Sequence, residues 1–151
     1  MEIDAIDRKI LRSVQRDISH PLEYLAETVG LSRNAVWRRL KSLEQHGYID
    51  KKVALLNPQK LGIDLLVFIQ VRTNEHDAAW CDRFAAAVKR TPQILSAHRM
   101  TGDLDYLIKA RVKNVEEYDS LYQNLTRQIS LNDVSASFVM ESLKDTTELP
   151  F

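Results

Sequence analysis

The residues with the clearest chemical potential gather around the stretch MTGDLDYLIKA, residues 100–110. Asp103 and Asp105 lie two positions apart beside Gly102, and His98 lies just upstream. Residues two apart on a strand point the same way, so the two carboxylates could serve acid–base catalysis or hold a metal ion. A Gly-Asp pair is equally typical of a tight turn. The choice between catalytic cluster and turn depends on the elements that position the stretch.

A second catalytic motif does not accompany the two carboxylates. The sequence has no phosphate-binding loop and no recognisable nucleophile, and its four histidines are scattered rather than placed at metal-ligand spacing. We therefore predict a protein that is not an enzyme, with no catalytic residues, no metal site and no cofactor.

The composition is that of an ordinary globular protein, with 44% hydrophobic and 28% charged residues among 151. The single cysteine, Cys81, excludes an intrachain disulfide framework. The first ten residues, MEIDAIDRKI, are charged where a signal peptide would be apolar, and no apolar run approaches the roughly 20 residues that span a bilayer. We expect a cytoplasmic protein with no membrane partner.

The formal net charge of zero conceals an asymmetry along the chain. Residues 1–60 carry a net charge of +3, and residues 61–151 carry −3. Within residues 32–52, six basic residues stand against two acidic ones. Such a local excess is what phosphate binding needs, although a solvated helix face would produce the same run.

The first half of the chain has the spacing of a helix-turn-helix. Apolar residues at helical spacing predict helices over residues 3–14, 22–29 and 32–46. A helix-turn-helix needs a small residue where two helices cross, a glycine in the turn and an apolar residue that locks the second helix. Ala26, Gly30 and Val36 meet these needs in that order.

The third predicted helix is the candidate recognition helix. With Val36 in the core, Arg33 and Asn34 fall in the exposed first turn, where they could bind base edges, while later basic residues would bind phosphate. Trp37 fits either packing or a DNA contact. We predict double-stranded DNA as a partner, contacted by Ser32, Arg33, Asn34, Trp37, Arg38, Arg39, Lys41, Lys51 and Lys52.

The run YIDKKVALLN, residues 48–57, alternates in the manner of a short β hairpin. Such a hairpin would form the wing of a winged helix-turn-helix, with Lys51 and Lys52 at its tip. Asn57-Pro58 then breaks the pattern, and the charge balance changes sign beyond it. We place the DNA-binding domain at residues 1–57 and a linker at residues 58–62.

The second half contains the same unit twice. Runs rich in β formers alternate with amphipathic helices, and their order predicts a βαββαβ, ferredoxin-like domain over residues 63–151. The predicted strands are 65–72, 94–101, 104–112 and 134–140, and the predicted helices are 77–90 and 115–129. The fold class is therefore α+β. One face of such a sheet stays open, which favours pairing with a second copy, and a symmetric dimer suits a helix-turn-helix.

The chain as a whole resembles the Lrp/AsnC (feast/famine) transcriptional regulators. The resemblance rests on five stretches in order: DRKIL, LSRNAVWRRLKSLEQHGYI, ALLNPQKLG, TGDLDYLIKA and SFVMESLKDTTELP. It implies homodimers that assemble into octamers or other higher oligomers, association with the nucleoid, and a small amino-acid effector bound between the sheet-bearing domains.

The resemblance also implies which residues form the effector site. Carried over by position, they are His98, Met100, Thr101, Gly102, Asp103, Asp105 and Tyr106 around the turn, and Ser135, Ala136, Ser137 and Phe138 on the last strand. Asp105 could pair with an α-amino group, and turn N–H groups could bind an α-carboxylate. Asp103 could be either a turn residue that caps backbone N–H groups or a direct contact of the ligand. An architectural DNA-binding protein of the same fold, without an effector, remains the alternative.

The recognition helix departs from the pattern of many family members. Those members carry Ser/Thr-rich residues and a valine-arginine pair there, whereas this chain reads SRNAVWR over residues 32–38. The DNA sequence preferred elsewhere in the family is therefore not expected to apply here.

Overall fold

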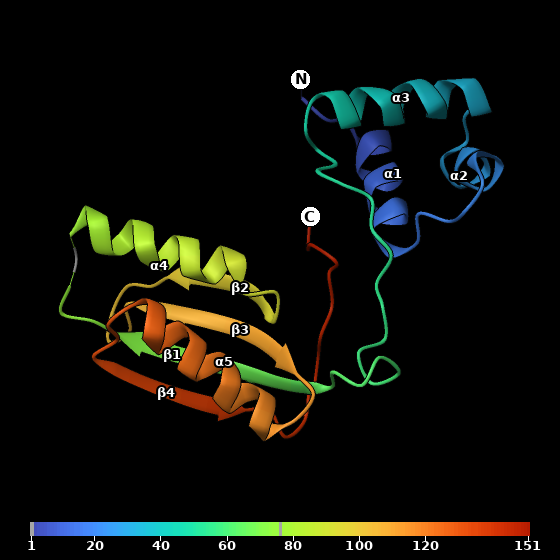
Figure 1. Ribbon diagram of the computed structural model, residues 1–151. Helices are drawn as coiled ribbons and strands as arrows, with labels where there is room; N and C mark the ends of the chain where they lie inside the picture. Colours follow the sequence, from blue (N-terminus) through green and yellow to red (C-terminus); the bar gives the residue numbers. More distant parts are fainter. Residues whose placement is uncertain (1, 76) are drawn as a thin grey trace. The chain divides into compact units, whose positions relative to one another are not determined.

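A computed structural model describes residues 2–75 and 77–151 (Figure 1). The chain divides into two compact units, one formed by Met1–Leu55 together with Leu143–Phe151 and the other by Leu56–Ser142. We expected the second domain to continue to residue 151, but the last nine residues pack with the first unit. Among the described residues, no helix has the length and apolarity needed to cross a membrane.

The first unit contains three helices, α1 (Ala5–Arg16), α2 (Leu22–Val29) and α3 (Arg33–Gln45). Local side chains set where they begin. Asp4 and Asp7 form a reciprocal capping box at the start of α1, with the Asp4 carboxylate 2.7 Å from the Asp7 nitrogen. Ser32 caps α3 by accepting the Ala35 N–H. The helices enclose a core of Ile10, Leu11, Leu25, Ala26, Val36, Leu40 and Leu43.

The turn between α2 and α3 confirms the predicted helix-turn-helix. Gly30 has a φ of 70°, a left-handed conformation that a side chain would strain. The N–H of Leu31 then donates to the Ala26 carbonyl at 3.0 Å, which closes the end of α2. Ala26 and Val36 are both buried, as their predicted roles require.

The predicted wing is wrong for this chain. Residues 50–57 form no strand, and Val53, Leu55 and Leu56 are 58%, 74% and 72% exposed. The reason is local, because the expected tip Asp50-Lys51-Lys52 contains none of the Gly or Asn residues that two-residue hairpin turns require. Despite the alternating pattern, these residues form no regular element and pair with no strand among the described residues.

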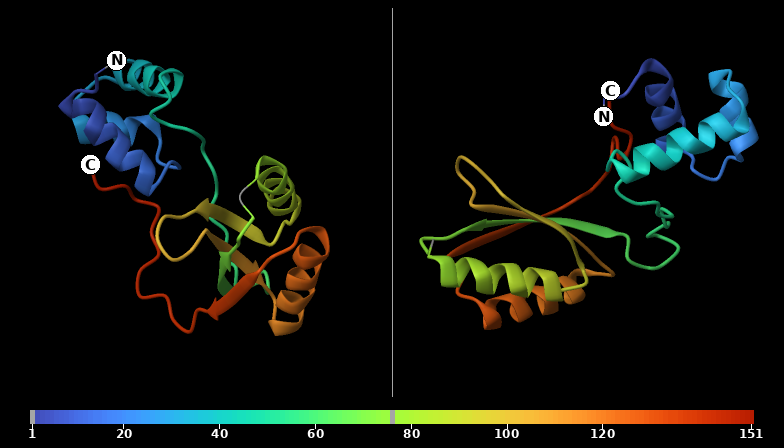
Figure 2. Two further views of the ribbon diagram at one scale, coloured as in Figure 1. Left: turned by 90° about the vertical axis from the view of Figure 1, so that its left-hand side faces the viewer. Right: turned by 90° about the horizontal axis from the view of Figure 1, so that it is seen from above.

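The second unit confirms the predicted βαββαβ order. Its elements are β1 (Leu65–Arg72), α4 (Ala78–Arg90), β2 (Ile94–Arg99), β3 (Tyr106–Val112), α5 (Val115–Gln128) and β4 (Asp133–Phe138). The strands form one antiparallel sheet in the order β2-β3-β1-β4. Both helices cover the same face of this sheet (Figure 2).

Strand alternation explains which side chains meet the helices. Val67, Ile69 and Val71 of β1 are almost completely buried, and so are the alternate residues of β3, Ile108 and Ala110. They pack in one cluster with helix residues that include Trp80, Phe84, Leu121 and Leu125. The sheet and the two helices therefore share one hydrophobic core.

Neither α4 nor α5 covers the other face of the sheet, and that face is mixed in character. By alternation, Phe68 and Gln70 of β1 face that side, with Leu107 and Lys109 of β3 and Ser135 of β4. Ser135 donates to the Gln70 side chain at 3.3 Å.

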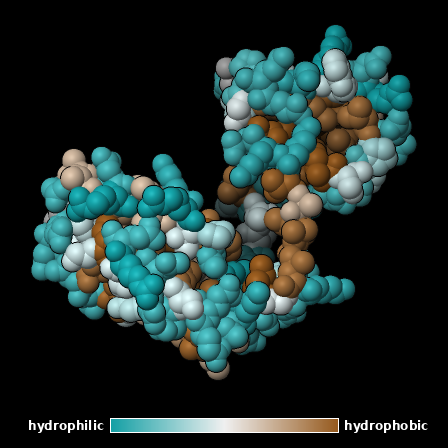
Figure 3. Space-filling model, viewed as in Figure 1, coloured by the Kyte–Doolittle hydropathy of each residue, from teal (hydrophilic) through white to brown (hydrophobic). Residues whose placement is uncertain are grey.

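Figure 3 shows hydrophobic residues gathered on the visible face of the unit that holds α1, α2 and α3.

Candidate DNA-binding surface and effector site

The outward side of α3 carries a continuous stripe of polar and aromatic side chains. Arg33, Asn34, Trp37, Arg38 and Lys41 are all exposed and recur at the spacing of one helix face. No acidic residue lies in the first turn of α3, so the positive end of the helix dipole adds to the two arginines. This stripe can bind both base edges and phosphates.

A hollow of about 360 Å³ lies at the start of α3, lined by Leu22, Glu23, Arg33, Asn34 and Trp37. Arg33 Nη1 lies 2.8 Å from Glu23 Oε1, and this hydrogen bond lowers the pKa of Glu23. Trp37 is 53% exposed and borders the same hollow. Of the two roles open to Trp37, the structure therefore favours a surface residue beside Arg33 and Asn34.

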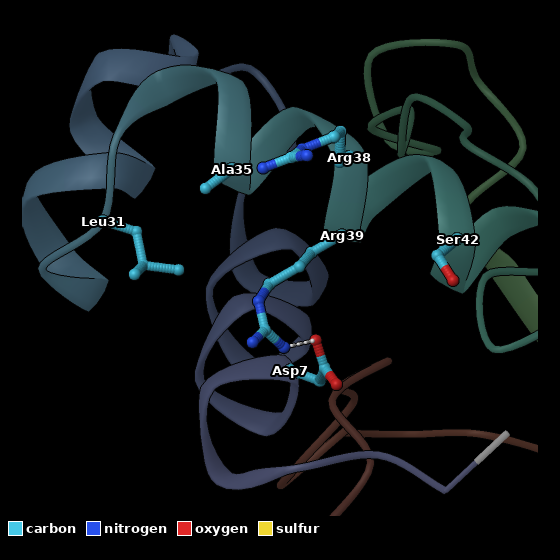
Figure 4. A pocket seen from close by; sticks show the side chains of 6 residues that line it. All are labelled: Asp7, Leu31, Ala35, Arg38, Arg39 and Ser42. Carbon is cyan, nitrogen blue, oxygen red and sulfur yellow. Dashed lines mark hydrogen bonds and ion pairs between the residues drawn. The ribbon is translucent and has the colours of Figure 1, made fainter.

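Arg39 leaves α3 toward α1 rather than toward the outward stripe (Figure 4). Its Nη1 lies 2.8 Å from carboxylate oxygens of both Asp4 and Asp7. The hydrogen bonds to Asp7 and Asp4 raise the pKa of Arg39. Because Asp7 is buried, its charge needs this partner. We predicted Arg39 as a phosphate contact, but its geometry assigns it to holding α1 against α3.

A second hollow, of about 460 Å³, adjoins this ion pair and is lined by Asp7, Leu31, Ala35, Arg38, Arg39 and Ser42. Arg38 and Arg39 point to different sides of α3 in Figure 4. Arg38 is exposed, and no ion pair within the described residues engages it. Its charge is therefore available to a phosphate.

The two lysines expected in the wing differ in their surroundings. Lys51 is exposed in the irregular segment after α3. Lys52 pairs through Nζ with Glu44 near the end of α3, and this hydrogen bond lowers the pKa of Glu44. Lys52 is thus held beside α3, whereas Lys51 projects from an unpaired backbone.

Residues 100–105 form the connection between β2 and β3. Met100 N–H donates to the Asp105 carbonyl at 2.8 Å, and Gly102 has a φ of 94°. Among the described residues, no acceptor is bonded to the backbone N–H groups of Thr101, Gly102 or Asp103. The turn therefore presents free donors that an anionic group could occupy.

Asp105 ties this turn to the end of β1. Its Oδ2 accepts the N–H of Thr73 at 2.8 Å, and its own N–H donates to the Val71 carbonyl at 3.1 Å. One carboxylate oxygen thus has a structural partner, and Oδ1 has no protein hydrogen bond within the described chain. Asp105 is half-buried, so its second carboxylate oxygen is the one left for a further partner.

Arg72 connects the same turn to β4, a role that we did not predict from the sequence. Its Nε donates to the Asp103 carbonyl at 2.9 Å, and its Nη1 lies 2.8 Å from Asp133 Oδ2. The only sequence signal was the position of a charged residue at the end of the apolar run LLVFIQVR. Arg72 therefore links the backbone of the turn to the side chain of Asp133 at the start of β4.

The predicted residues of β4 do not share one face. Ser135 and Ser137 point to the open face by alternation, while Ala136 and Phe138 pack against the helix-covered core. The Phe138 ring lies 5.2 Å from the Tyr118 ring in an edge-on arrangement. We therefore remove Ala136 and Phe138 from the candidate effector residues and keep the two serines.

Tyr106 also belongs to the core rather than to the turn surface. Its ring lies 4.4 Å from Phe84, and its hydroxyl lies 3.8 Å from Cys81 Sγ. Burial raises the pKa of Tyr106, with a further contribution from Cys81. Among the other predicted residues, His98 and Met100 are exposed on and after the edge strand β2.

The carboxylates of the turn belong to no metal-binding constellation. In the described part of the chain, no group of three or more His, Cys, Asp or Glu side chains is arranged to hold a metal ion. In the turn, the Asp103 carbonyl accepts from Arg72. The Asp105 carboxylate accepts the Thr73 N–H, and the Asp105 N–H donates to the Val71 carbonyl.

Comparisons with known proteins agree with this arrangement. Residues 3–44 match the model of the AsnC-type helix-turn-helix domain, and residues 66–149 match that of the Lrp/AsnC ligand binding domain. The glutamate uptake regulatory protein of Zymomonas mobilis is 44% identical over 149 residues, which cover 99% of this chain and 91% of that protein.

Two crystal structures share the fold over nearly the whole chain. An AsnC family transcriptional regulator from Agrobacterium tumefaciens has a TM-score of 0.94 and 41% identity, covering 98% of this chain and 97% of that one. A transcriptional regulator from Neisseria meningitidis, solved as a complex with L-methionine, has a TM-score of 0.94 and 33% identity, covering 99% and 97%. The chain therefore belongs to the Lrp/AsnC family of DNA-binding transcriptional regulators.

Proposed function

We propose that this protein is a sequence-specific transcriptional regulator whose DNA binding or assembly responds to a small amino acid. The observation that carries the proposal is the presence, in one chain, of an exposed basic stripe on α3 and a turn with free backbone donors beside an oriented carboxylate. The first feature suits DNA, and the second suits a zwitterion.

The DNA contacts divide into two kinds by position on α3. Arg33 and Asn34 lie in the first turn, where bidentate contacts to guanine and adenine are possible. Arg38, Lys41 and Lys51 lie farther along the chain and suit phosphates. Trp37 can contact a thymine methyl group from its place between them.

The effector site would take an amino acid in a defined orientation. The N–H groups of Thr101, Gly102 and Asp103 can donate to the α-carboxylate, and the free oxygen of Asp105 can accept from the α-ammonium group. Ser135 and Ser137 lie on the open face of the sheet, where a second copy of the chain can complete the site. The proposed assembly is a homodimer or a higher multiple of it, acting on DNA in the cytoplasm.

The relatives suggest which effectors to try first. One relative regulates glutamate uptake, as its name states, and one related structure contains L-methionine. L-Glutamate and L-methionine therefore head a screen of the twenty amino acids.

The test is a thermal-shift screen of the full-length protein followed by DNA binding. An effector at a hundred times its dissociation constant adds about 2.7 kcal/mol to the free energy of unfolding, enough to raise the melting temperature by several degrees. A stabilising amino acid must then also change affinity for DNA fragments selected from the genome of the source organism. Selective DNA binding without a response to any amino acid would favour the architectural alternative.

A further inference from the structure

The last residues of the chain return to the DNA-binding unit and lie along α1 (Figures 1 and 2). Three side chains of α1 hold them. Arg12 Nε donates to the Phe151 carbonyl at 2.7 Å, and Arg16 Nε lies 3.0 Å from Glu148 Oε2. Arg12, Gln15 and Arg16 occupy positions i, i+3 and i+4 and therefore form one strip on α1.

Gln15 binds the backbone of the tail in two directions. Its Nε2 donates to the Leu149 carbonyl at 3.2 Å, and its Oε1 accepts the Leu149 N–H at 2.9 Å. An amide side chain that matches both groups of one residue reproduces the pairing of two β-strands. This contact fixes the register of the tail on α1 without depending on the Leu149 side chain.

Phe151 supplies the apolar part of the contact. Its half-buried ring packs against the core of α1, α2 and α3, and Arg12 Cζ lies 5.8 Å from the ring centroid. In contrast, Leu143 is 90% exposed in the same segment. The tail is thus held at residues 148–151 and not along its whole length.

The sequence of the tail favours the bound conformation. Pro150 restricts the preceding residue, Leu149, to an extended backbone, which is the conformation that Gln15 pairs with. The Thr146 hydroxyl accepts the Glu148 N–H at 3.1 Å and shapes the approach. A preorganised segment loses less conformational entropy on docking.

We propose that the Arg12–Gln15–Arg16 strip is a binding site for residues 148–151 of the same chain, so that the DNA-binding unit is tethered at both ends. One tether is the segment before β1, and the other is the tail that follows β4. The polar contacts are exposed and individually weak, so the tail docks reversibly. The docked tail restricts the positions that the DNA-binding unit can take.

Photo-cross-linking of the full-length protein tests the docking directly. Phe151→p-benzoylphenylalanine keeps an aromatic ring at the docking position, and Leu143→p-benzoylphenylalanine is the control in the same tail. We expect the residue 151 probe to give an adduct of single-chain mass whose attachment maps to α1 peptides, and the residue 143 probe to give at least five-fold less of it.

Charge reversal then distinguishes docking from chance proximity. Arg16→Glu should reduce the residue 151 adduct several-fold, and adding Glu148→Arg should restore it. An adduct that joins two chains, an adduct indifferent to these changes, or none at all would overturn the proposal. None of these outcomes would affect the proposed function, because DNA and effector binding do not require the tail contact.

Binding to DNA sites with different half-site spacings tests whether the docked tail restrains the DNA-binding units. This test rests on the proposed dimer. Two tethers limit the separation of the two DNA-binding units, so the wild type should discriminate between half-site spacings more sharply than Arg16→Glu. The double variant Arg16→Glu/Glu148→Arg should recover that discrimination. Equal spacing profiles for all three proteins would contradict the restraint.

Discussion

Arg39 Nη1 lies 2.8 Å from Asp7 Oδ1, and this ion pair joins α3 to the start of α1. Asp7 is only 3% exposed, so removal of Arg39 leaves a buried carboxylate without its cationic partner. We predict that Arg39→Ala lowers the free energy of unfolding of the DNA-binding unit by roughly 2 kcal/mol. Chemical denaturation measures this loss, and Arg38→Ala, one position away and exposed, is the matched control with little change in stability.

Arg38→Ala should weaken binding to all DNA sequences alike. A phosphate contact contributes counterion release and no sequence information, so its loss should reduce the slope of log affinity against log salt by about 1. Binding titrations at several salt concentrations, on a selected site and on random DNA, measure both quantities. A loss confined to the selected site would assign Arg38 to base reading instead.

Asn34→Ala should behave in the opposite way. As a base contact, Asn34 would contribute about 1–3 kcal/mol of discrimination, and its loss should leave nonspecific affinity and the salt slope nearly unchanged. Competition between the selected site and single-base variants identifies the base pair involved. If all base variants keep their relative affinities, Asn34 does not read sequence.

Asp105→Asn separates the two roles of Asp105. In the wild type, the Thr73 N–H donates to the Asp105 carboxylate at 2.8 Å. The amide oxygen of asparagine can still accept this N–H, but it carries no charge to pair with an α-ammonium group. We predict that Asp105→Asn keeps stability and DNA binding while effector affinity falls at least ten-fold. Asp105→Ala should lose effector response and stability together. Wild-type effector affinity in Asp105→Asn would exclude an ion pair with the ligand.

The stability of the DNA-binding unit should fall at acid pH in part through Asp4. Its pKa is lowered from 3.8, first by the hydrogen bond from the Asp7 N–H and also by Arg39. A depressed folded-state pKa gives stability that is present above the unfolded value and lost as the pH falls through the folded value. Melting curves from neutral to acid pH should show a steeper decline for the wild type than for Asp4→Asn, whose amide retains a helix cap. Parallel declines would remove Asp4 from the explanation.

Much of the fold could be predicted because its signals are local. Helical spacing, the Ser32 cap and the Gly30 turn all act within a few residues. The observed α3, Arg33–Gln45, lies one residue inside each end of the predicted range 32–46. The prediction of a wing was wrong because a hairpin also needs a partner strand. The alternation at residues 48–57 favours a strand but does not specify its partner.

The candidate sites depended more on contacts between distant residues. Arg39 resembled its neighbour Arg38 in sequence, and only the approach of α1 gave it Asp4 and Asp7 as partners. Arg72 lies 31 positions from Asp103, which its side chain holds. The tail had no periodic pattern, and its docking depends on Gln15, 134 positions away from Leu149. Such pairs leave no local signal in a single sequence.

The central claim is that one chain couples DNA reading to an amino acid, and fluorescence anisotropy tests it most directly. Full-length protein is titrated onto a labelled DNA site selected from genomic fragments, with and without each amino acid that stabilises the protein. We predict that at least one amino acid changes the affinity for the site about five-fold or more, as coupled sites do, and that Asp105→Asn abolishes the change. Identical titrations with and without every stabilising amino acid would contradict the account.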